Sequence, residues 1–191
     1  VLANKIIPDK RDKTLHYLSL AFARESFKVI GGFNYQPILA NPTLRRISQV
    51  LDIELHGNPE AAGQIVHHVQ IGAASTQRVT EMLQESSLLI VTSSRDELLV
   101  TLANIYNIPE YHHLLAGLLI PGMAQVSSIT QKILDRSGVP YMRISKNTAE
   151  VFNIINDDVS KLNAKDTQKI ELIKELANKR FNFDAIDALL G

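Results

Sequence analysis

The sequence contains no cysteine among its 191 residues. Disulfide bonds, thiolate metal ligands and cysteine nucleophiles are therefore excluded. No apolar run approaches the roughly 20 residues that a membrane-spanning helix needs. Charged residues at Lys5, Asp9 and Lys10 come too early for the apolar centre of a secretory signal. We therefore expect a cytoplasmic protein with no membrane partner.

Neither sign of charge is in excess, because Lys+Arg and Asp+Glu both number 20 and the formal net charge is zero. This balance gives no electrostatic footprint for nucleic acid, so we expect no nucleic-acid partner. Apolar residues make up 45% of the sequence and charged residues 21%, which is typical of a chain that buries a core.

Several short sequence motifs of phosphate-binding and catalytic sites are also missing. The sequence has no G-x-x-x-x-G-K-[ST] or G-x-G-x-x-G phosphate loop and no G-x-S-x-G nucleophile elbow. The adjacent His67 and His68 fall on an expected strand, where neighbouring side chains point to opposite faces, and no H-E-x-x-H is present. We therefore expect no catalytic residue, no metal and no cofactor in this chain.

Apolar runs alternate with amphipathic segments along most of the chain. Strands are predicted at residues 1–7, 28–33, 65–72, 87–92, 114–120 and 140–145. Helices are predicted at residues 12–26, 96–106, 125–136 and 147–155, and also from 42, from 76 and from 166. The later strands are continuous apolar runs, which is typical of a sheet covered on both faces. The predicted fold class is α/β: a doubly wound, mainly parallel sheet preceded by a partial βαβ unit and followed by C-terminal helices.

Helix starts carry their own signals. Asn41 before Pro42 is an expected N-cap, and Ser75 is another. Asn147 with Glu150 has the spacing of a capping box. Serines 93 and 94 precede the helix at 96–106, and capping is the favoured interpretation of both.

Three regions are expected: residues 1–44 with a linker, residues 45–160 as the main α/β domain, and residues 161–191 as C-terminal helices. The tail helix either packs on its own domain or bridges to a subunit or a following domain. The apolar segment Phe181–Leu190 predicts a dimer or larger homo-oligomer.

The segment T-S-S-R-D-E at 92–97 is the strongest candidate site. Ligands of open α/β sheets bind outside the carboxyl ends of the strands, and an arginine there can grip phosphate or carboxylate. The next loop contains a glycine that permits close approach of a ligand. The candidate residues for a small anionic metabolite or nucleotide are Thr92, Ser93, Ser94, Arg95 and Gly122. Plain structural turns are the alternative, because Asp96 and Glu97 already complement the helix dipole.

Longer stretches of the sequence resemble a known family. QIGAASTQRVTEML, LLIVTSSRDELLVTLANIY and LAGLLIPGMAQVSSITQKILDRSGVPYMRISKNTAEV are similar to the DRTGG domain in the middle of long bacterial phosphate acetyltransferases. The stretch PILANPTLRRISQVLDIELHG resembles the link that precedes this domain. Ser94 stands where the family has Asp, and Ile120-Pro121-Gly122 replaces T-G-G, whereas Arg95 and Gly122 remain.

The opening VLANKII…FKVIGGF is similar to the last βαβ part of the dethiobiotin-synthetase-like domain that begins those enzymes. The resemblance implies a nucleotide-base remnant at Asn4 and Lys5. The tail KIELIKELANKRFNFDAIDALL looks like the helices that lead to the catalytic acyltransferase domain, which converts acetyl-CoA and phosphate to acetyl phosphate and CoA.

The resemblance implies a non-catalytic regulatory and assembly region of a phosphate acetyltransferase, whose catalytic domain lies elsewhere in the parent chain. A stand-alone nucleotide- or metabolite-sensing protein is the second hypothesis. Chemistry of its own in the Ser93–Arg95 loop is the third.

Overall fold

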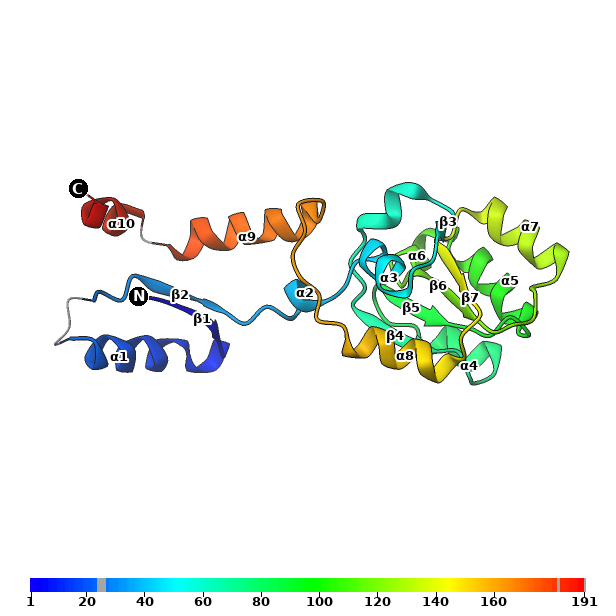
Figure 1. Cartoon of the computed structure of the whole chain (residues 1–191), viewed down its shortest axis with the longest axis horizontal. Coiled ribbons are helices and arrows are strands. Elements are labelled where there is room, and N and C mark those ends of the chain that lie inside the picture. The colour runs from blue at the N-terminus through cyan, green and yellow to red at the C-terminus, as the bar shows by residue number, and fades with distance from the viewer. Residues whose placement is uncertain (24–26, 182, 191) are drawn as a thin grey trace. The chain divides into compact units, whose positions relative to one another are not determined.

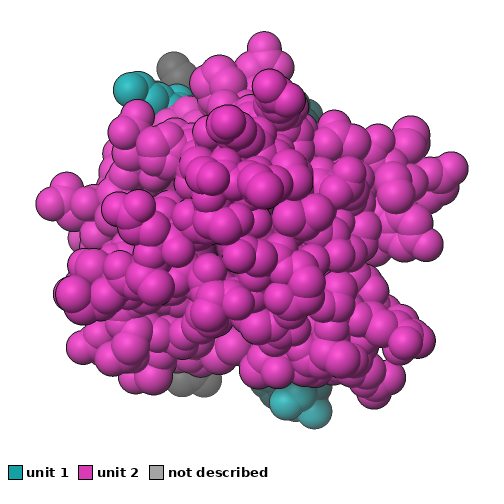
Figure 2. Space-filling model, turned by 90° about the vertical axis from the view of Figure 1, so that its right-hand side faces the viewer, with its two compact units in different colours: residues 1–39, 162–191 teal, residues 40–161 magenta. Residues whose placement is uncertain are grey.

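The computed structural model describes residues 1–23, 27–181 and 183–190. The chain divides into two compact units, coloured separately in Figure 2: unit 1 consists of residues 1–39 and 162–191, and unit 2 of residues 40–161. The sequence-based division treats residues 161–191 as a region of their own, whereas the structure joins residues 162–191 with the start of the chain.

Unit 2 is built on a five-stranded sheet with the strand order β3-β7-β6-β5-β4 (Figure 1). The strands are β3 (Leu55–His56), β4 (His68–Ile71), β5 (Ser87–Ile90), β6 (Leu115–Pro121) and β7 (Tyr141–Ile144). Strands β4 to β7 are parallel, and β3 pairs antiparallel with β7 at the edge. The mainly parallel α/β sheet is therefore confirmed. Strand β3 was not predicted, because two residues are too few to show a period.

Helices cover both faces of this sheet (Figure 1). They are α3 (Leu44–Leu51), α4 (Thr76–Glu81), α5 (Asp96–Ile105), α6 (Pro109–His112), α7 (Ser128–Ser137) and α8 (Thr148–Asp157), with a 3-10 helix at Pro59–Gly63. One apolar cluster joins the sheet to α3 and α8, and the other joins it to α4, α5 and α7. This two-sided burial is the reason why the central strands β5 and β6 are largely apolar on both faces.

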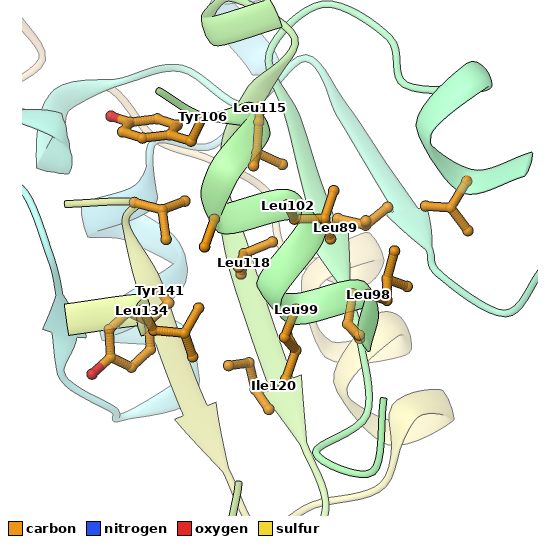
Figure 3. Packing of buried hydrophobic residues seen from close by; sticks show 14 of the residues in the cluster. Leu89, Leu98, Leu99, Leu102, Tyr106, Leu115, Leu118, Ile120, Leu134 and Tyr141 are labelled. Carbon is orange, nitrogen blue, oxygen red and sulfur yellow. The ribbon is translucent and has the colours of Figure 1, made fainter. Parts of the chain in front are cut away.

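Successive side chains of β5 point to opposite faces of the sheet and pack into the two clusters in turn. Leu88 and Ile90 belong to the cluster of α3 and α8, whereas Leu89 packs with the opposite one. Figure 3 shows Leu89 among leucines of α5 and β6, in a layer where the side chains are almost fully buried. Unit 2 therefore has a complete core on each side of its sheet.

The predicted N-caps at Ser75 and Asn147 are confirmed. Ser75 caps α4 by accepting the N–H of Arg78, and Asn147 with Glu150 forms the expected capping box of α8. The prediction of Asn41 as a cap is wrong. The carbonyl of Pro42 accepts the N–H of Val66, so Pro42 lies outside the helix. The cap of α3 is instead Thr43, which accepts an N–H at 3.2 Å.

Unit 1 contains a two-stranded parallel sheet of β1 (Leu2–Ile6) and β2 (Gly31–Asn34). Its helices are a 3-10 turn at Pro8–Lys10, α1 (Arg11–Ala21), α2 (Pro37–Ala40), α9 (Thr167–Arg180) and α10 (Phe183–Leu190), with Ala40 at the boundary with unit 2. The helix predicted at 12–26 thus ends earlier, and its residues 24–26 lie outside the described part of the chain.

Contacts distant in sequence hold unit 1 together. The rings of Phe33 and Phe181 meet edge to face with centroids 5.0 Å apart. Lys169 is almost completely buried, and its Nζ donates to the carbonyl of Leu39 at 3.3 Å. Burial lowers the pKa of this lysine. These contacts place α9 with β2 and α2, which no local sequence pattern indicates.

Candidate functional site

Four parallel strands of unit 2 end at one edge of the sheet, which we call the carboxyl edge. Each strand is followed by a loop and then a helix that starts at this edge. The loops are residues 72–75 before α4, 91–95 before α5, 122–127 before α7 and 145–147 before α8. All five predicted site residues of unit 2 lie in these loops.

Ser93 and Gly122 are in contact at the carboxyl edge. The N–H of Ser93 donates to the carbonyl of Pro121 at 3.3 Å. Gly122 has a φ of +118°, and a Cβ at this position would come within 3.2 Å of Ser93 Oγ. Its N–H donates to the carbonyls of Ile144 and Lys146 at 3.0 and 3.1 Å. One glycine thus connects the loops after β5, β6 and β7, and both the backbone angle and the space favour glycine there.

Thr92 and Ser94 lie at the surface beside this contact. Both residues are exposed, and their hydroxyl oxygens are 3.2 Å apart. Neither caps α5, whose N-cap is Arg95 without a side-chain bond, so the predicted capping by the serines is wrong. The physical reason is that Ser94 pairs with Thr92 and buried Ser93 faces Gly122. Two exposed hydroxyls thus remain available as hydrogen-bonding groups for a ligand.

Arg95 is directed to the loop before α4. Its two terminal nitrogens donate to the carbonyls of Gly72 and Ala74 at 3.3 and 3.1 Å, and its Nε donates to Glu97. This bond is the main cause that lowers the pKa of Glu97. Three of the five N–H donors of the guanidinium are therefore used within the protein. The ligand role of Arg95 stays a prediction, beside a structural role as a bridge between two loops.

Two basic residues near Gly122 were missed by the sequence interpretation. Arg143 is the third residue of β7 and donates from Nη2 to the carbonyl of Ala124 at 3.0 Å. Lys146 is exposed and follows the same strand. The segment R-I-S-K at the end of an apolar run was the available signal. The carboxylate of Glu150 is held in the capping box of α8. The loops around Gly122 therefore present positive charge.

A carboxylate at the same edge has an incomplete set of hydrogen bonds. Asp96 is the first residue of α5, and its Oδ1 is the buried side-chain oxygen for which the described residues supply no donor. The negative charge stabilises the start of the helix. A buried acceptor without a partner is unfavourable, so this oxygen is a position where a donor from water or a ligand would be stabilising.

Asn4 and Lys5 line a cavity of about 500 Å³ in unit 1, together with Lys10, Thr14 and apolar side chains of α1. Asn4 Oδ1 accepts the N–H of Lys5 at 2.8 Å, and Lys5 has a φ of +57°. The Asn4 side chain thus stabilises an uncommon backbone turn. The proximity of these two residues to a nucleotide base stays a prediction.

Among the described residues, no three His, Cys, Asp or Glu side chains are arranged to hold a metal ion. The rings of His67 and His68 have centroids 6.5 Å apart at a steep angle. In the same described ranges, no helix combines the length and apolar character needed to traverse a bilayer.

Comparison with known proteins identifies a family and a similarity to solved structures. Curated protein sequences give no match. The chain is similar to the crystal structure of the CBS and DRTGG domains of the regulatory region of Clostridium perfringens pyrophosphatase, complexed with its activator diadenosine tetraphosphate. The identity is 13% and the TM-score 0.49, over 92% of this chain and 85% of that chain. The family model of the DRTGG domain matches residues 46–157, which coincide with nearly all of unit 2. Since this match spans more than half of the sequence, the chain belongs to the DRTGG domain family.

Proposed function

We propose that the chain is a non-catalytic regulatory and assembly region of a phosphate acetyltransferase. In this proposal a small anionic metabolite or nucleotide binds at the carboxyl edge of unit 2. The observation that carries the proposal is the contact of Ser93 with Gly122, beside the basic Arg143 and Lys146. Membership of the DRTGG family and the stretches that resemble the acetyltransferases support the choice of parent enzyme.

The mechanism is a shift between conformations. A ligand that binds one arrangement of the loops better than another changes their populations by its difference in affinity. Helix α8 starts at the carboxyl edge with the capping box and ends directly before Asp158, which forms an ion pair with Arg46. The helix therefore links the candidate site to the two points where the chain enters and leaves unit 2.

A thermal-shift screen of the full chain tests the site. The panel contains acetyl-CoA, CoA, acetyl phosphate, ATP, AMP, NADH, pyruvate and inorganic phosphate. A ligand at about a hundred times its dissociation constant stabilises the folded state by about 2.7 kcal/mol. We expect a shift with at least one anion, which Arg143→Gln reduces and Arg136→Gln leaves unchanged. Arg136 is a matched exposed arginine in the last turn of α7. A flat panel would contradict the ligand site.

A stand-alone sensor is the second candidate, and one observation favours it. Unit 2 has a complete core on both faces of its sheet, so it needs no acyltransferase domain in order to fold. If the chain is part of a phosphate acetyltransferase, the full reading frame should encode a catalytic domain and the purified protein should form acetyl phosphate. A stand-alone sensor should show neither. Light scattering tests the assembly role, and a monomer at micromolar concentration would contradict the expected homo-oligomer.

A further inference from the structure

Two of the most exposed apolar side chains of unit 2 lie in the segment that contains Gly122. Met123 is 86% exposed in the loop before α7, and Ile129 is 71% exposed in the first turn of that helix. Single exposed apolar residues are common on protein surfaces. Met123 and Ile129 lie on one short segment next to basic residues, which favours a shared role in binding. This role rests on the proposed anion site.

The local structure fixes this exposure. The positive φ of Gly122 sets the direction of the chain before Met123. Val126 then packs into the core, and Ser127 caps α7 by accepting the N–H of Thr130 at 3.2 Å. Thr130 is the first buried residue of α7, so Ile129 lies outside the buried side of the helix. Both apolar side chains thus project from a segment that is anchored at each end.

Two basic residues contact the same segment, Arg143 through its side chain and Lys146 through its backbone carbonyl. Arg143 donates to the carbonyl of Ala124, one residue after Met123, and Gly122 donates to the carbonyl of Lys146. A bare phosphate would use the basic groups and leave the apolar side chains in water. A ligand that joins a phosphate to a flat ring would use both, because methionine packs favourably against aromatic rings.

We propose that the ligand of the carboxyl edge is a purine nucleoside monophosphate. Its phosphate binds between Arg143 and Lys146, and its base lies on Met123 and Ile129. The guanidinium of Arg143 is suited to the phosphate because it offers planar paired donors. Burial of the base supplies the affinity that a phosphate alone lacks at an exposed site.

The test compares AMP with ribose 5-phosphate by isothermal titration calorimetry on the full chain. We expect AMP to bind at least tenfold more tightly, since one face of the base is removed from water. The double variant Met123→Ser/Ile129→Ser should weaken AMP about tenfold and leave ribose 5-phosphate unchanged. Arg143→Gln should weaken both ligands. Val159→Ser is the matched control, because Val159 is 77% exposed just beyond the other end of α8.

The outcomes separate this inference from the proposed function. Equal binding of AMP and ribose 5-phosphate, or full AMP affinity in the double variant, overturns the base position while the anion site stands. Binding of another compound of the panel without AMP overturns the assignment of a nucleoside monophosphate alone. Failure of every anion to bind overturns both proposals. Far-UV circular dichroism of each variant confirms that a loss of binding does not reflect unfolding.

Discussion

Units 1 and 2 bury their apolar side chains to very different extents. In the part of the chain whose burial is described, the buried apolar residues lie in unit 2 with the exception of Ile6. Unit 1 instead buries two charged residues, Asp166 and Lys169. Since apolar burial is the main favourable term in folding, unit 2 should fold as a stable domain and unit 1 should be far less stable. The DRTGG domain of unit 2 thus has enough buried apolar surface to be stable by itself, whereas unit 1 does not.

The largest expected effect lies in the core of unit 2. Leu118→Ala removes a fully buried side chain in the middle of β6 (Figure 3). The lost burial and the cavity together should cost about 3–4 kcal/mol. Urea unfolding followed by circular dichroism measures this loss. Leu20→Ala, on the exposed face of α1, should change stability by less than about 0.5 kcal/mol. Similar costs for the two variants would contradict the place of Leu118 in the core of unit 2.

The second largest effect should come from unit 1 and tests whether this unit unfolds independently of unit 2. Ile6→Ala removes its buried apolar side chain from β1, at a cost of about 2–3 kcal/mol. Hydrogen exchange with mass spectrometry should then show loss of protection in β1 and β2. Amides of β5 should keep their protection, because a locally unstable unit opens without the other. If β5 also lost its protection, the two units would be one cooperative structure.

High pH should lower the stability of unit 2, in part through Tyr141. Burial, and then a hydrogen bond of 2.6 Å to Asp135, raise the pKa of Tyr141 to about 12. A raised pKa in the folded state means that this stability is complete below pH 10 and is lost as pH rises through 12. The loss should reach about 2 kcal/mol at pH 12. Between pH 9 and 12, the free energy of unfolding should fall less steeply with pH in Tyr141→Phe than in the unchanged chain. An equal fall in both would contradict the role of Tyr141.

Unit 1 should respond to pH in the opposite direction. Burial lowers the pKa of Lys169, so the folded state disfavours its charged form. The penalty is present at neutral pH and disappears as pH rises through the lowered pKa toward the ordinary lysine value of 10.5. The rate of proteolysis in β1 and β2 should therefore fall between pH 7 and 10. Lys169→Met should remove this trend, and a trend that persists would place its origin elsewhere.

The smallest effect concerns the ion pair of Arg46 with Asp158. The arginine donates from Nε and Nη2 at 3.0 and 2.6 Å, and its side chain is 38% exposed. Solvent screening reduces such a pair to about 0.5–1 kcal/mol. A double-mutant cycle with Arg46→Met and Asp158→Asn measures the coupling. A coupling near zero would show that the pair fixes geometry without contributing stability.

The sequence predicts local features of this fold better than distant ones. The apolar runs of β5 and β6 and the capping box of α8 each lie within a few residues and were recognised. The pairing of Phe33 with Phe181, and of Leu39 with Lys169, joins positions too far apart for any periodic pattern. For this reason the C-terminal helices were expected as a separate region.

The candidate site shows the same limit. Parallel strands bring their following loops together, so the proximity of Ser93 and Gly122 could be expected from the order of the elements. The direction of the Arg95 side chain could not, because it depends on carbonyls that the loop after β4 presents. Arg143 was missed for a similar reason, since a basic residue inside an apolar run gives no sign of the loop that it contacts.

The ion pair between Arg46 and Asp158 also bears on how this domain could be transplanted. The two residues stand at the first turn of α3 and just after α8, so the ends of the family match lie side by side. A domain whose ends meet can be inserted into a surface turn of an unrelated host without stretching either chain. Residues 40–161 should therefore fold when they are inserted into such a turn, and the insertion would transfer the proposed ligand response to the host.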